Sequence, residues 1–216
     1  MTVGRAAAVH TRSSLWRSWL VWVTAGELVG FTFPAVVGVL STGWPDLAEA
    51  AALVGAGAVE GAALGWAQTR VLRRVLPQLG AGAFILATSA AAMLAYAISM
   101  VPVIFGARLL QLPMPVLVAL ATGLGALLLA SIGTAQWLVL RRSLARSASW
   151  VATTAAAWAA GLLAFTAVAP PLWQPGQPVL LAVAIGLLGG LVMATVVAAI
   201  TGWAVLRLMA RHVDTA

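Results

Sequence analysis

Two acidic residues, Glu27 and Glu60, lie inside long apolar stretches of the sequence and far from the ends of those stretches. A carboxyl group in such a place can carry a proton, or it can bind a cation or a cationic substrate. An ionised carboxylate at the centre of a bilayer costs roughly 2.5–3.5 kcal/mol on insertion scales. Glu27 and Glu60 are therefore the first residues at which chemistry is expected.

The two acids are predicted to lie at the same depth. Glu27 precedes Gly43 by 16 residues and Glu60 follows Trp44 by 16, and the turn between the first two apolar stretches centres on Gly43 and Trp44. Each acid is also 10 residues from the arginine at the far end of its stretch. At a rise of about 1.5 Å per residue, this distance of ~15 Å places both near the middle of a ~30 Å apolar core.

Two polar neighbours complete the candidate set for substrate or proton binding. Thr24 lies three residues before Glu27, and Gln68 lies eight residues after Glu60 on the face that Glu60 shares with Gly57. Gln68 has a structural alternative, which is to bond a neighbouring helix. Three interpretations of the acids stay open: protonated carboxyls that bond across helices, a site for protons or cations, and recognition of a partner helix.

The composition predicts the elements that position these residues. The chain is 62% apolar and 8% charged, with a mean hydropathy of +1.03. Such long apolar runs without strict alternation indicate membrane-spanning helices rather than a strand barrel. The first run contains Glu27 and is too long for a typical signal peptide, so we expect it to be retained. We predict an all-α, integral membrane domain over residues 1–216, with spans at 18–41, 47–71, 80–105, 114–140, 147–169 and 179–206.

Arginines predict the orientation of the helices. Eleven of the twelve lie on one side of the predicted spans, and only Arg108 lies on the other. The positive-inside rule makes the arginine-rich side cytoplasmic, so both termini are expected there, in a multi-pass protein of the cell (inner) membrane. The residues expected to anchor the cytoplasmic helix ends are Arg73, Arg74, Arg141, Arg142 and Arg207.

Similar segments recur along the chain. Gln-x-x-Val-Leu-Arg-Arg occurs at 68–74 and 136–142, and a shorter version ends at Arg207. The offsets are 68 and 66 residues for these ends, and 63 and 65 for the starts of the odd-numbered helices. This pattern predicts three two-helix hairpins in one orientation, around a pseudo-three-fold axis. The predicted repeats are about 12–76, 77–146 and 147–212.

The acids depart from this repeat. The positions equivalent to Glu60 hold Leu128 and Ala194, and the positions equivalent to Glu27 hold alanines. Packing common to all three hairpins therefore does not require a carboxyl group, which favours a specialised site in the first hairpin.

Small residues recur at four-residue spacing and allow close approach of helix backbones. Packing within one chain and a homo-oligomer interface both remain possible uses of these faces. The glycines expected to serve helix packing are Gly57, Gly61, Gly65, Gly186, Gly190 and Gly202.

The motif Gln-x-x-Val-Leu-Arg-Arg, followed by Trp150-Val151 and a helix rich in small residues, resembles uncharacterised bacterial multi-pass membrane proteins with repeated hairpins. The resemblance covers most of the chain. It implies a packing and topology pattern, and it implies no substrate and no catalytic residue.

Several function classes find no support in the residues. The chain has no Cys, and its only histidines are His10 and His212 near the termini. Thiolate or zinc chemistry, haem ligation between helices and a membrane-embedded Ser-His pair are therefore not expected. The dispersed arginines also argue against nucleic-acid binding. We expect no enzyme, no cofactor and no metal.

Three functional hypotheses remain, the third being a sensor of lipid or of small apolar ligands. The first is a small proton- or cation-coupled transporter that uses the midplane carboxylate pair. The second is a non-catalytic membrane scaffold or subunit that packs through its Gly/Ala faces. The expected partners are the lipid bilayer and either further copies of the chain or a membrane partner subunit.

Overall fold

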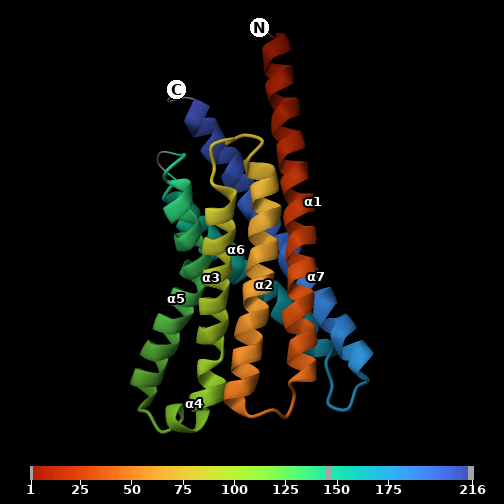
Figure 1. Ribbon diagram of the computed structural model, residues 1–216, viewed down its shortest axis with the longest axis vertical. Coiled ribbons are helices and arrows are strands. Elements are labelled where there is room, and N and C mark those ends of the chain that lie inside the picture. The colour runs from red at the N-terminus through yellow and green to blue at the C-terminus, as the bar shows by residue number, and fades with distance from the viewer. Residues whose placement is uncertain (1, 145–146, 214–216) are drawn as a thin grey trace.

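The computed structural model of this protein describes residues 2–144 and 147–213, with side chains for 13–144 and 147–210. Every regular element in these residues is helical (Figure 1). The helices are α1 (Thr2–Leu40), α2 (Asp46–Leu72), α3 (Ala81–Ser99), α4 (Val101–Leu109), α5 (Met114–Leu140), α6 (Ser149–Leu172) and α7 (Val179–Val213).

The predicted all-α membrane fold with six spans is confirmed. Six segments of the described chain are long and apolar enough to cross a bilayer, and the third of them comprises both α3 and α4. The predicted third span is broken at Met100, where Pro102 follows in the first turn of α4 and has no backbone N–H to donate. α1 and α7 also extend beyond the predicted spans at the ends of the chain.

The long helices form a closed ring. α1 packs against α2, α2 against α3, α3 against α5, α5 against α6, α6 against α7, and α7 returns to α1. The short α4 lies beside α3 and α2. A ring of this kind has an interior to which all six long helices can contribute side chains.

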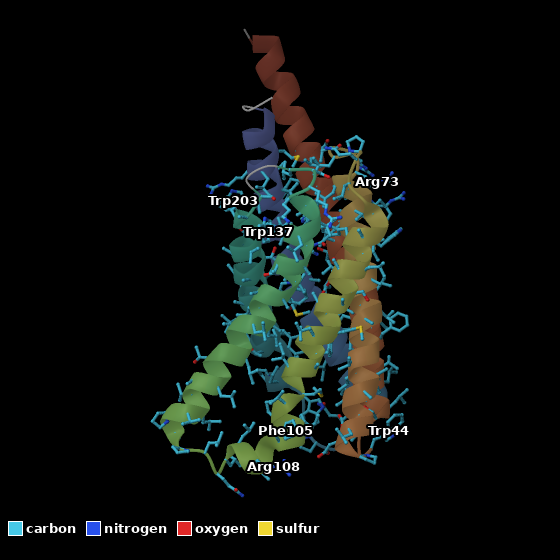
Figure 2. All side chains as sticks on the ribbon, turned by 60° about the vertical axis from the view of Figure 1, so that its left-hand side comes forward. Trp44, Arg73, Phe105, Arg108, Trp137 and Trp203 are labelled. Carbon is cyan, nitrogen blue, oxygen red and sulfur yellow. The ribbon has the colours of Figure 1, made fainter. Side chains whose placement is uncertain are left out.

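Both chain ends lie at the same end of the ring (Figure 1). Arg73, Trp137 and Trp203 also lie there, whereas Trp44 and Arg108 lie at the other (Figure 2). We call the first the arginine end and the second the opposite end. Which of the two ends faces the cytoplasm stays a prediction. Of the arginines predicted to lie on the cytoplasmic side, Arg146 and the side chains of Arg5, Arg12 and Arg211 lie outside the described residues.

Arginines at this end stack on tryptophan rings. The Arg207 guanidinium carbon lies 3.5 Å from the centre of the Trp203 ring, and the same distance is 5.2 Å from Arg141 to Trp137. Arg70 lies 4.4 Å from the centre of the Trp22 ring. Such cation–π contacts stabilise both side chains at the boundary between apolar and polar surroundings.

The ring is packed tightly at the arginine end and loosely at the opposite end. Trp19 and Trp150 are buried in the core at the arginine end and meet edge to face, with ring centres 6.1 Å apart. Towards the opposite end, every residue of α5 from Met114 to Gly123 except Leu117 is exposed. α5 correspondingly leans away from the other helices there (Figure 2).

Glycines bring α2 against α3. A Cβ atom on Gly61 would lie 2.6 Å from the Ala92 Cβ, and one on Gly65 would lie 3.0 Å from the Ile85 Cα. Gly57 faces the ring of Tyr96. Of the other predicted packing glycines, Gly190 meets Phe31 and Gly202 meets Trp19, whereas a Cβ atom on Gly186 would meet no described atom of another helix within 4 Å. Five of the six therefore pack within the chain.

We expect Gly61→Ala to destabilise the protein by about 1–3 kcal/mol, because the added methyl group overpacks the contact between α2 and α3. Thermal unfolding in a mild detergent measures the effect. Gly55→Ala is the matched control, since Gly55 lies on the same helix with no described atom within 4 Å of its would-be Cβ. Equal unfolding temperatures for the two variants would contradict the assigned packing.

Candidate functional site

The ring of helices surrounds a cavity of about 220 Å³. Each of the six long helices contributes to its wall. Most of the wall is apolar, and both membrane-embedded acids are part of it. The residues that matter most for its chemistry are Glu27, Phe31, Glu60, Tyr96, Trp158 and Met193.

Glu60 is held by a hydrogen bond from a neighbouring helix. The Tyr96 hydroxyl donates to Glu60 Oε2 at 2.6 Å, and both side chains line the cavity. Gly57, one turn before Glu60, leaves room for the Tyr96 ring between α2 and α3. Tyr96 was missed by the sequence analysis, although it is the only tyrosine of the chain and lies within an apolar stretch.

Glu27 is fully buried, and the Glu60 carboxyl group is the one partner among the described residues that its carboxyl oxygens can bond. It lies close enough to Glu60 for the two carboxyl groups to interact electrostatically. Gly30 permits this approach, because a Cβ atom there would lie 2.9 Å from the Glu60 Cα. Two adjoining buried carboxyl groups are costly when ionised, and a proton or a cation can relieve that cost.

The other two predicted site residues lie away from the cavity wall. Thr24 is one turn before Glu27, and its buried hydroxyl has no hydrogen-bond partner among the described residues. Gln68 is two turns beyond Glu60 and belongs to a separate polar cluster. The structure therefore brings Glu27 and Glu60 together and adds Tyr96 to them, while Thr24 and Gln68 face other surroundings.

This polar cluster joins four helices. The Gln136 amide nitrogen donates to Gln68 Oε1 at 2.6 Å and to Thr88 Oγ1 at 3.1 Å, and the Trp150 indole nitrogen donates to Gln136 Oε1 at 2.9 Å. All four side chains are buried. On α2, α5 and α6 the cluster lies nearer the arginine end than the residues that line the cavity. It therefore closes the interior of the ring on that side.

We expect Gln136→Leu to destabilise the protein by about 1–3 kcal/mol for each buried group that it leaves unpaired. The Trp150 N–H and the Gln68 carbonyl would both lose their partner. Unfolding of Gln68→Leu, Gln136→Leu and the double variant in detergent tests this, because the double variant no longer contains the orphaned Gln68 carbonyl. Its loss of stability should be smaller than the sum of the single losses, and simple additivity would contradict the bond.

The electrostatic character of the cavity is one-sided. Two carboxyl groups line it, and none of the described lining residues is Arg, Lys or His. The site is therefore suited to a positively charged occupant or to protons, and it has no group that would neutralise an anion.

Comparison with protein-family models, with curated proteins and with solved structures finds no match for this chain.

Proposed function

We propose that this multi-pass membrane protein is a small transporter that binds an organic cation at Glu27 and Glu60 in exchange for protons. The observation that carries the proposal is the meeting of two buried acids in one cavity where Glu27 has no bonding partner among the described residues other than the acid Glu60, and where no described lining residue is basic. Simple bonding of protonated acids between helices would account for Glu60, which has Tyr96. Among the described residues, Glu27 has only the Glu60 carboxyl group within bonding reach, and a bond between two carboxyl groups requires a proton that they share.

The composition of the cavity wall favours an organic monocation over a metal ion. Calcium and magnesium ions prefer six or more oxygen ligands, and no group of three or more His, Cys, Asp or Glu side chains gathers among the described residues. Phe31, Tyr96 and Trp158 supply aromatic surface around the acids. Aromatic rings attract ammonium groups, and the attraction is strongest where water is excluded.

Exchange for protons follows from the cost of charge in the bilayer. The empty site is least costly when its acids are protonated. The occupied site is least costly when the positive charge of the ammonium ion takes the place of the proton. Cation binding should therefore release protons, and affinity should rise as pH rises. The closed arginine end and the loosely packed opposite end support a carrier that is open towards one side.

Reconstitution into proteoliposomes tests the proposal. Tetramethylammonium and larger quaternary ammonium ions serve as probes. Uptake of the ion and release of protons are both measured between about pH 6 and 9. We expect uptake that requires an imposed proton gradient. Transport or binding that is undiminished in a Glu27→Gln/Glu60→Gln double variant would eliminate this mechanism.

The scaffold hypothesis has less support from the packing. Five of the six glycines proposed for helix contacts are occupied within the chain, and Gly186 alone among them has no described neighbour. Of these six glycines, Gly186 alone is therefore free to direct assembly with further copies or with a partner subunit.

A further inference from the structure

A second space adjoins the cavity on the outer side of the ring. It is a groove between α5 and α6 that is lined by Gly125, Leu128, Leu129, Ala159, Leu162 and Thr166, together with Leu163. Leu163 is 71% exposed and Thr166 is also exposed, so the groove faces outwards, where a membrane-spanning protein meets lipid. Its wall carries no charged side chain.

The groove and the cavity share two side chains. Leu128 and Leu162 line both spaces, one from α5 and the other from α6. No other residue is common to the two sets of lining residues. A molecule that reached from the acids to the lipid along this path would therefore pass these two leucines.

The contact between α5 and α6 is sparse on the side towards the opposite end. Gly123 and Gly125 have no described atom within 4 Å of their would-be Cβ atoms. Residues 114–123 of α5 are exposed almost throughout, as described above. Beyond Leu128 and Leu162, the space beside Gly125 can therefore hold a chain of methylene groups.

We propose that Leu128 and Leu162 form a lateral portal, and that the substrate is a single-chain alkylammonium ion that enters from the lipid phase. Its ammonium group would lie at Glu27 and Glu60, and its alkyl chain would pass between the leucines into the α5–α6 groove. This inference rests on the proposed function and adds the substrate class and the route of access.

Size and polarity argue for this occupant. A cavity of about 220 Å³ is smaller than the roughly 300–1,000 Å³ pockets that enclose drug-sized ligands. A ligand with a long apolar part must therefore extend beyond the cavity, and the groove offers an uncharged surface on the other side of Leu128 and Leu162. The two acids match the ammonium group of an alkylammonium ion, and the apolar groove matches its alkyl chain.

A chain-length series tests the portal. Affinities of tetramethylammonium, butyltrimethylammonium and octyltrimethylammonium are measured for the full chain in lipid nanodiscs, by competition with radiolabelled tetramethylammonium. The Glu27→Gln/Glu60→Gln variant provides the background for partitioning into lipid. Referred to the concentration of ion that is free in water, affinity should rise by up to about fourfold for each methylene group that the groove buries, which corresponds to ~0.8 kcal/mol.

Gly125→Leu fills the groove from α5 and should reduce the ratio of octyltrimethylammonium to tetramethylammonium affinity at least tenfold. Ala159→Leu fills it from α6 and gives a second, independent variant. The matched control is Gly123→Leu, which introduces the same side chain on the same helix outside the groove and should keep the wild-type ratio.

The outcomes separate the two proposals. Either of two results would overturn the portal and keep the cation site. One is binding of tetramethylammonium with no gain in affinity as the chain lengthens. The other is a gain in affinity that Gly125→Leu and Ala159→Leu both leave intact. A wild-type protein that binds none of the three ions at any pH would overturn the proposed function itself, and the portal with it.

Discussion

Glu27→Gln and Glu60→Gln should each abolish most of the cation binding, with a loss of roughly 30-fold to several thousand-fold in affinity. This range corresponds to about 2–5 kcal/mol, which is typical when one member of a buried, charged pair is removed. Glutamine keeps the size of the side chain and removes the negative charge that the ammonium group requires. Proton release on addition of the cation should disappear together with the binding.

The control for this result is Asp46→Asn, which removes an exposed acid in the first turn of α2 and should leave affinity within about twofold. Equilibrium binding by titration calorimetry in buffers of different ionisation enthalpy measures both affinity and the protons released. A cation affinity that survives in both glutamine variants would show that the two acids serve only to hold the helices together.

Gly30→Ala should reduce cation affinity by about tenfold or more, because the added methyl group would lie 2.9 Å from the Glu60 Cα and force α1 away from α2. The two carboxyl groups would then move apart and no longer meet one ammonium group. Overpacking of this kind destabilises a protein by about 1–3 kcal/mol, so unfolding is measured beside the binding.

Gly38→Ala is the matched control on the same helix. Its would-be Cβ lies 3.8 Å from the Leu53 side chain, which is an ordinary van der Waals contact. Tyr96 should keep its bond to Glu60 in both variants, so a loss of affinity confined to Gly30→Ala would report the separation of the acids. A Gly30→Ala protein that is destabilised and still binds the cation normally would contradict this reasoning.

The six spans were predictable because the requirement for about 20 apolar residues per span leaves a strong signal in the sequence. Counting outwards from the turn at Gly43 and Trp44 also placed Glu27 and Glu60 at one depth, and both now line the same cavity. Depth along a helix follows from sequence distance alone, so it needs no knowledge of which helices are neighbours.

The direction of a side chain around the helix axis was harder to predict. Gln68 is eight residues from Glu60, which amounts to a rotation of about 80° after two full turns. This rotation takes Gln68 out of the cavity and towards Gln136 on α5. The contribution of Tyr96 depends on α3 packing against α2 at Gly57, and neither helix carries a pattern of residues that identifies its neighbour.

The distribution of glycines divides the ring into a stiff part and a compliant part. Gly30 holds α1 against α2, and Gly61 holds α2 against α3, through contacts too close to admit a methyl group without a shift of the helices, and Gly65 adds a further close contact to α3. Both acids and Tyr96 belong to this stiff part, whereas α5 stands away from its neighbours over residues 114–123. Any slow, large-amplitude motion should therefore be concentrated in α5. The distance between Glu27 and Glu60 should stay constant while α5 moves on the other side of the cavity. Hydrogen exchange should accordingly be fast in the half of α5 that begins at Met114 and slow throughout the central turns of α2.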